Sequence, residues 1–220
     1  MERHFHEELS ELKHLLVRMA GTAEQMIGDA IRMLVHRDES VREAIACHEH
    51  EVNRMQCEVD EQCTRLIALH QPTASDLRFI LGCIKTNSEV ERLADEAVNI
   101  SHKAERLLQE PPVTDFIVIP EMATMAAAMV KDSIHAYVNG NVEEARAVIV
   151  RDAAINSLKG AATDRMLALM TSTSTAIPRA LDIIMVTRNI ERIGDHAKNI
   201  CENAIYVAEG RDIRHPRDFD

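Results

Sequence analysis

The chain has 220 residues, of which 46 % are hydrophobic and 3 % aromatic, and it carries a formal net charge of −11. This hydrophobic content is enough to bury a core, and so few aromatic, Gly and Pro residues argue against a turn-rich all-β protein. The negative charge argues against nucleic acid and anionic lipid headgroups as partners.

Apolar residues recur at spacings of three and four along most of the chain, which is the period of helices that bury one face. The pattern predicts six helices, over residues 2–36, 40–69, 72–109, 120–139, 142–171 and 177–209. The sharpest interruption is EPPVTD, because two consecutive prolines cannot continue a helix. We therefore expect an all-α fold with a linker at this point.

The two halves of the chain repeat each other. ERLADEAVNI at 91–100 and ERIGDHAKNI at 191–200 share six of ten residues, and weaker matches at an offset of 103 relate the earlier helices. Repetition of this kind indicates one structural plan used twice. We predict two tandem three-helix bundles, residues 1–110 and 118–220, with a linker at 111–117 and a short C-terminal tail on the second bundle.

Each copy of the repeat places oxygen-bearing side chains four residues apart, on one face of its helix. These are Glu91, Asp95 and Asn99 in the first half, and Glu191, Asp195 and Asn199 in the second. The preceding helix of each half adds an acid and an amide at the same spacing: Glu49 with Asn53, and Asp152 with Asn156. Because these helices are expected to be antiparallel neighbours, the side chains can face each other across a groove.

Two interpretations of these carboxylates stay open. Oxygen ligands bind hard divalent cations, so each groove is a candidate metal site, and the metals we consider are Mg²⁺, Mn²⁺, iron and Zn²⁺. In the alternative, Arg92 pairs with Asp95, Arg192 pairs with Asp195, and the face is simply solvated. Duplication of the pattern favours the metal, since a solvated face has little reason to keep the same letters twice.

No enzymatic site is indicated. Di-iron oxidases built on helix bundles need paired ExxH motifs, and the sequence has one, from Glu11 to His14. A glycine-rich phosphate loop, a nucleophile elbow and HExxH are all missing. We expect no catalytic residues and no organic cofactor, and most histidines, including His196, are expected at the surface.

The five cysteines are odd in number and contain no CxxC, so they indicate buried thiols in a reducing cytosol. The N-terminus lacks the apolar segment of a signal peptide, and the most apolar stretch is interrupted by Pro120 and Glu121. A cytoplasmic protein without membrane insertion is therefore expected.

QPTASDLR at 71–78, ERLADEAVNI and NIERIGDHAKNICE at 189–202 resemble the PhoU family of bacterial phosphate-uptake regulators. The resemblance covers nearly the whole chain and implies a cytoplasmic negative regulator of the phosphate-starvation response. It also implies contacts with a sensor histidine kinase and with the ATP-binding subunit of the phosphate ABC transporter, a peripheral place at the membrane through these partners, and a homodimer. The alternatives are a carboxylate-rich metal-storage or redox bundle and a salt-bridged scaffold.

The family is also associated with metal clusters held by paired E(D)xxxD motifs. Glu91 with Asp95 and Glu191 with Asp195 match that motif. The second-helix motifs depart from it, because Asn53 and Asn156 stand where the motif has Asp. A neutral amide removes one charge from each site, so the resemblance implies at most weak metal binding here.

Overall fold

The computed structural model describes residues 2–111 and 118–214. Its α-helices are α1 (Glu2–His36), α2 (Arg42–His70), α3 (Ala74–Leu108), α4 (Val118–Asn139), α5 (Val142–Ser172) and α6 (Ile177–Glu209). Short 3₁₀ turns, Glu39–Val41 and Ser174–Ala176, lead into α2 and α6. The described residues form no strand, so the predicted all-α class and six helices are confirmed.

Local sequence chemistry explains where several helices begin and end. The side chain of Asn141 accepts a 3.2 Å hydrogen bond from the backbone N–H of Glu144, which caps the start of α5. Gly210 ends α6 with a φ of 69°, a left-handed conformation that glycine adopts without strain. Pro178 lies in the first turn of α6, where its missing N–H costs no helical hydrogen bond.

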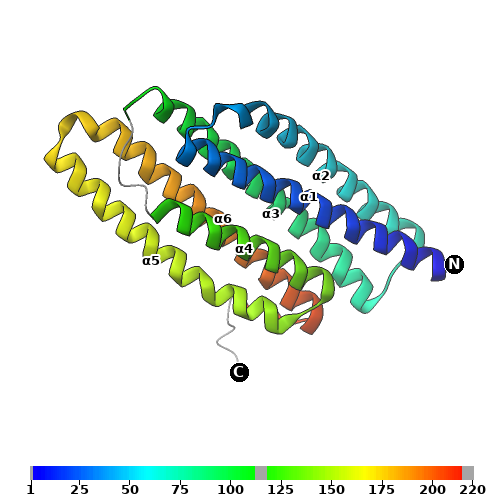
Figure 1. Ribbon diagram of the computed structural model, residues 1–220. Helices are drawn as coiled ribbons and strands as arrows, with labels where there is room; N and C mark the ends of the chain where they lie inside the picture. The colour runs from blue at the N-terminus through cyan, green and yellow to red at the C-terminus, as the bar shows by residue number, and fades with distance from the viewer. Residues whose placement is uncertain (1, 112–117, 215–220) are drawn as a thin grey trace.

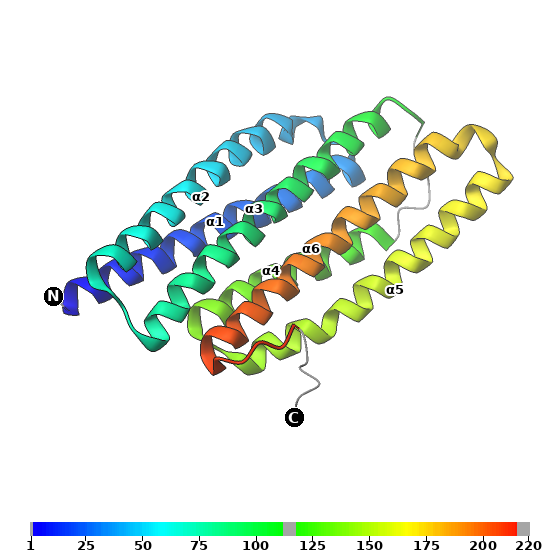
Figure 2. The ribbon, with the colours of Figure 1, turned by 180° about the vertical axis from the view of Figure 1, so that it is seen from behind.

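Helices α1 to α3 form one bundle and α4 to α6 form the other, as the duplication predicts (Figure 1). The bundles lie side by side, with α3 against α6 and α1 against α4, while α2 and α5 flank the molecule (Figure 2). One continuous hydrophobic core runs through both halves. The predicted linker spans residues 111–117, and all of it but residue 111 lies outside the described residues, so the domain boundary stays a prediction.

A close contact between the halves depends on Gly82 in α3. A methyl group on Gly82 would lie 2.6 Å from Val207 Cγ2 on α6 and 3.0 Å from Tyr137 Oη on α4. Only glycine at this position therefore lets α4 and α6 approach α3 this closely. The buried Tyr137 hydroxyl then donates a 2.7 Å hydrogen bond to the carbonyl oxygen of Phe79. This polar contact links α4 of the second bundle to α3 of the first.

The expectation of buried cysteines is partly wrong. Cys63, Cys83 and Cys201 are buried, but Cys47 and Cys57 are exposed. Both exposed thiols lie on α2, a flanking helix that buries a single face, and they project from its other side. Hydropathy of the residue type alone did not reveal this.

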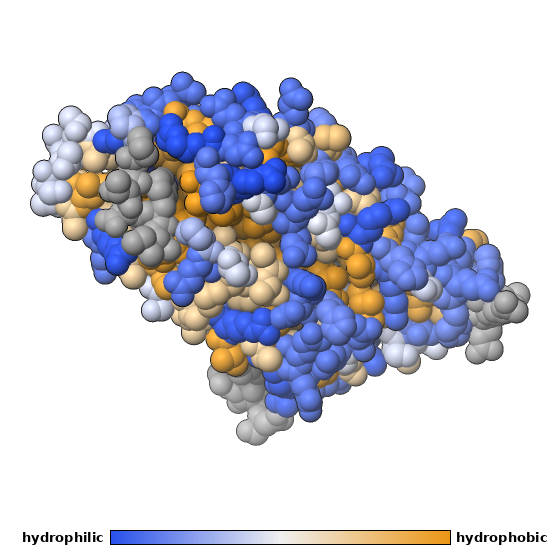
Figure 3. Space-filling view, in the orientation of Figure 1, coloured by the Kyte–Doolittle hydropathy of each residue, from blue (hydrophilic) through white to orange (hydrophobic). Residues whose placement is uncertain are grey.

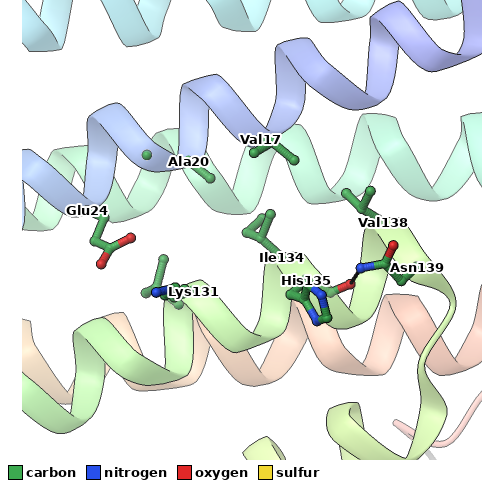
Figure 4. Close-up of a pocket in the computed structure, with 10 residues that line it drawn as sticks. Val17, Ala20, Glu24, Lys131, Ile134, His135, Val138 and Asn139 are labelled. Carbon is green, nitrogen blue, oxygen red and sulfur yellow. Dashed lines mark hydrogen bonds between the residues drawn. The ribbon is translucent and has the colours of Figure 1, made fainter.

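The α1–α4 face carries an apolar band. Figure 3 shows hydrophobic side chains gathered between these two helices. A hollow of about 390 Å³ lies there, lined mainly by Val17, Ala20, Ile134 and Val138 (Figure 4). Over the described residues, no helix has the length and apolar character needed to cross a bilayer.

Candidate functional site

The second bundle brings together the residues predicted from the repeat. Asp152 is buried on α5 and its Oδ2 accepts a 3.2 Å hydrogen bond from Asn156 Nδ2. Burial raises the pKa of Asp195 on α6, and the nearby charges of Glu191 and Asp152 raise it further. These four side chains form a cluster between α5 and α6, called here the α5–α6 cluster.

Two lysines supply positive charge to this cluster. Lys159 Nζ lies 2.7 Å from Glu191 Oε1, and Lys198 Nζ lies 3.6 Å from Asp152 Oδ2. The other carboxylate oxygen of Asp152, Oδ1, is buried and has no hydrogen-bond partner in the structure. A buried acceptor left in this state is energetically costly, so Oδ1 is available to a cation or another donor.

The first bundle assembles its predicted residues less completely. Burial and the neighbouring charge of Asp95 raise the pKa of half-buried Glu91, but Asp95 itself is exposed, as is Asn53. No hydrogen bond or ion pair among the described residues joins Glu49 or Asn53 to the Glu91–Asp95 pair.

The helix contact between α2 and α3 is instead made by a different polar side chain. Asn87 Nδ2 donates to the carbonyl oxygen of Gln56 at 2.9 Å and to Asp60 Oδ1 at 3.0 Å. In the repeat, Gln56 corresponds to Lys159, so the first half lacks the lysine that approaches Glu191 in the second half.

Asn99 and Asn199, the third residues of the two repeated Glu–Asp–Asn sets, lie near the contact between α3 and α6. Asn199 Nδ2 donates to Glu89 Oε2 at 3.0 Å, from α6 to α3. Burial raises the pKa of Glu96, and a side-chain hydrogen bond from Asn99 is among the contacts that oppose this rise, which places Asn99 beside that carboxylate. Among the described residues, no hydrogen bond joins either amide to the Glu and Asp that precede it in its own copy of the repeat.

The arginine pairs of the alternative interpretation are wrong. Arg92 lies 3.7 Å from Glu89, not beside Asp95, and Arg192 lies 3.0 Å from Glu96 on the neighbouring helix, not beside Asp195. The physical reason is burial: Glu96 is only 3 % exposed, and a buried carboxylate gains more from a guanidinium than an exposed one does. Tertiary packing of α3 on α6 therefore overrides the i, i+3 spacing.

A polar cluster at this helix contact was not predicted from the sequence. His196 is buried, contrary to the surface position expected, and its Nδ1 lies 2.8 Å from Glu89 Oε2. Burial raises the pKa of Glu96, although the Arg192 charge opposes that rise. One sequence feature could have indicated this cluster: at the sixth position of the ten-residue repeat, one copy has Glu96 and the other has His196.

Comparison with known proteins identifies the family. The model of the PhoU domain matches the chain twice, over residues 16–104 and 119–204. The chain belongs to the PhoU family. This confirms the resemblance seen in the sequence, and the two matched segments correspond to the two bundles.

Relatives of the family match almost the full length. The phosphate-specific transport system accessory protein PhoU homolog of Pseudomonas putida is 32 % identical over 98 % of this chain and 84 % of that protein. PhoU of Escherichia coli K12 is 30 % identical over 96 % of this chain and 88 % of its own length. The crystal structure of PhoU from Pseudomonas aeruginosa covers 94 % of this chain and 100 % of that chain with a TM-score of 0.90 and 30 % identity.

The family's metal motif fits the two halves differently. In the second half, three carboxylates and the unpartnered Asp152 Oδ1 share one cluster, which suits a hard cation, but Lys159 and Lys198 compete with it. Across residues 2–111 and 118–214, no three His, Cys, Asp or Glu side chains are arranged to hold a metal ion. Side chains of the α5–α6 cluster would have to leave their lysine partners to coordinate one.

Proposed function

We propose that this protein is a cytoplasmic negative regulator of phosphate uptake and of the phosphate-starvation response. The observation that carries the proposal is the match of both bundles to the PhoU domain, with relatives over nearly the whole chain named as accessory proteins of the phosphate-specific transport system. Under this proposal the protein has no catalytic role and acts through protein contacts.

The partners in this proposal are the ATP-binding subunit of the phosphate ABC transporter and a sensor histidine kinase. The fused bundles support it, because a body joined through α3 and α6 by a continuous core can hold two partners at a fixed separation. We further propose a homodimer and a peripheral place at the membrane through the transporter.

Deletion of the gene tests this function. Phosphate-starvation genes should be expressed in phosphate-rich medium in the deletion strain, and a plasmid copy of the wild-type gene should restore repression. A reporter fused to a starvation promoter measures both results. Normal repression in the deletion strain would remove the proposed function.

A second proposal concerns metal. Asp152 Oδ1 is buried without a hydrogen-bond partner, and this favours weak binding of a divalent cation at the α5–α6 cluster in competition with the lysines. Asp152, Glu191 and Asp195 would supply charged oxygens, and Asn156 a neutral one. Redox cycling of a bound metal would instead support the metal-storage or redox alternative.

A further inference from the structure

Helix α6 carries a row of exposed apolar side chains at its N-terminal end. Ile177, Leu181 and Met185 are 39 %, 51 % and 39 % exposed and follow each other at intervals of four residues. Residues at this spacing lie on one helix face. Isolated exposed apolar residues are ordinary, but three on consecutive turns form a continuous surface, called here the α6 stripe.

Positive charge borders the α6 stripe. Arg188 lies one turn beyond Met185 on the same face, and it forms no ion pair with any described part of the chain. On the adjacent α3, Arg106 NH2 lies 3.4 Å from Asp182 Oδ2, with 63 % of the arginine side chain exposed. Figure 2 shows α3 and α6 side by side on this face. In a chain of net charge −11, this local excess of cations is distinctive.

We propose that the α6 stripe docks an amphipathic helix of a protein partner. Apolar side chains of that helix would cover Leu181 and its neighbours, and acidic residues along its edge would meet Arg106 and Arg188. The charge complementarity specifies the partner's chemistry, because an acidic helix gains from these cations while a basic one is repelled. The inference rests on the proposed function for the idea that the protein acts through protein contacts.

Two other occupants fit less well. An anionic membrane would have to overcome repulsion from a protein with eleven excess negative charges, and three apolar side chains bury little area in a bilayer. A second copy of this chain meeting through the same stripe would bring like charges, Arg188 among them, onto a shared interface.

The duplication gives an internal comparison. Leu81 on α3 is the counterpart of Leu181 and is 43 % exposed, but the counterpart of Met185 is Lys85. The Lys85 Nζ lies 5.3 Å from the centre of the Tyr206 ring, which makes this position charged where the second half is apolar. The complete stripe therefore exists only in the second bundle.

A synthetic helical peptide of about 18 residues, long enough for five turns, tests the docking. It carries leucines four residues apart and glutamates along both edges, and binding is measured by fluorescence anisotropy. Leu181→Glu should weaken binding at least about tenfold, because it puts a charge into the apolar contact. Arg188→Glu should weaken it as well and remove most of its salt dependence.

Two variants serve as matched controls. Val150→Glu alters the large apolar side chain that is most exposed among the described residues, 76 % on α5, and should leave binding within about twofold of wild type. Leu81→Glu should do the same if the second half alone binds. Thermal melts establish that each variant is folded, which is expected because every substituted side chain is exposed.

Several outcomes would overturn the inference. Wild-type affinity in Leu181→Glu, an equal loss in Val150→Glu, or no binding of the peptide to wild type would each do so. Binding of anionic phospholipid vesicles without peptide binding would assign the stripe to a membrane. Loss of a dimer in Leu181→Glu, seen by sedimentation, would assign it to a second copy.

Failure of this inference and failure of the proposed function remain distinguishable. Peptide binding is measured on purified protein, whereas the function is tested by reporter expression in the deletion strain. A derepressed deletion strain with no peptide binding would remove the docking site only. Normal repression with intact, Leu181-dependent peptide binding would remove the regulatory function only.

Discussion

His196 Nδ1 on α6 lies 2.8 Å from Glu89 Oε2 on α3, so this polar contact joins the two bundles inside their interface. Burial alone would raise the pKa of Glu89, but hydrogen bonds from His196 and Asn199 hold it below its ordinary value of 4.5. A carboxyl whose pKa is lowered by folding stabilises the folded state wherever it is ionised. Glu89 therefore contributes to stability at neutral pH.

Glu89→Gln should lower the free energy of unfolding at pH 7 by about 1–3 kcal/mol, because it weakens a charge-assisted contact with a buried histidine. The lowered pKa means that the wild-type contribution is present above pH 4.5 and is lost as the pH falls through the folded-state pKa. The difference between variant and wild type should accordingly shrink in acid. Urea denaturation at a series of pH values measures it.

The matched control is Glu58→Gln on α2. Glu58 pairs with Arg54 at 3.2 Å, but both side chains are solvent-exposed, so the change should cost less than about 1 kcal/mol. Equal losses in the two variants would show that the α3–α6 contact has no special importance for stability.

Asp195→Asn should not lower the free energy of unfolding at pH 7, in contrast to Glu89→Gln. Burial, then the charges of Glu191 and Asp152, raise the pKa of Asp195 above its ordinary 3.8. Such a group destabilises the fold while ionised, and stability returns as the pH falls through the raised pKa. The variant should be as stable as wild type at pH 7 or more stable by a few tenths of a kcal/mol, and the gain should vanish below pH 3.8.

Asp182→Asn tests whether any loss of charge on α6 has that effect. Asp182 is buried between Lys103 Nζ at 3.7 Å and Arg106 NH2 at 3.4 Å, so removing its charge should reduce stability by about 1 kcal/mol or more. Thermal melts at pH 7 compare the two variants. Destabilisation by both would show that the carboxylates of the α5–α6 cluster do not repel one another.

Gly82→Ala should destabilise the protein by about 1–3 kcal/mol, because the added methyl group overlaps Val207 and crowds the Tyr137 hydroxyl. Gly21→Ala is the comparison, since a methyl group there meets no atom within 4 Å and α1 continues through it. That change should stabilise the helix by about 0.4–1 kcal/mol. Chemical denaturation measures the free energy of unfolding of both variants. Equal changes in the two would show that α3, α4 and α6 are not closely packed at Gly82.

The sequence was sufficient for the helices and the duplication because both follow from patterns along the chain. Period and punctuation placed α4 to α6 within about two residues of their observed ends, which is the usual uncertainty of helix boundaries. The sequence was insufficient to predict the contact of α3 with α6, because this contact depends on how two similar bundles pack against each other. The burial of Glu96 and His196 therefore came only from the structure.

The candidate metal residues show the same limit. Spacing correctly placed Asp152, Asn156, Glu191 and Asp195 together, because the α5–α6 register follows from antiparallel neighbours. Spacing said nothing about Lys159 and Lys198, whose long side chains reach the carboxylates from other helix positions. Partners of a charged side chain depend on tertiary geometry, which one helix period does not contain.

Binding of the proposed cation at the α5–α6 cluster should be visible as thermal stabilisation. An ion that binds only the folded state raises the melting temperature by mass action, so Mn²⁺ or Mg²⁺ should produce a small upward shift in wild type. Lys159→Gln should enlarge the shift, because it removes the ammonium group 2.7 Å from Glu191 and installs the residue that the first half has at Gln56. Asn156→Asp should also enlarge it by adding a charged oxygen next to Asp152.

The first bundle supplies the matched control for that experiment. Asn53→Asp makes the same chemical change on α2. No hydrogen bond among the described residues joins Asn53 to a carboxylate, whereas Asn156 bonds to Asp152, and Asp95 is exposed where Asp195 is half-buried, so the effect of Asn53→Asp on the metal shift should be smaller. Asp195→Asn should abolish the wild-type shift, since it removes a ligand. Differential scanning calorimetry with and without Mn²⁺ measures all four variants. If neither wild type nor Lys159→Gln responds to metal, the α5–α6 cluster is not a cation site even without its nearest lysine, and the repeated Glu and Asp serve the fold.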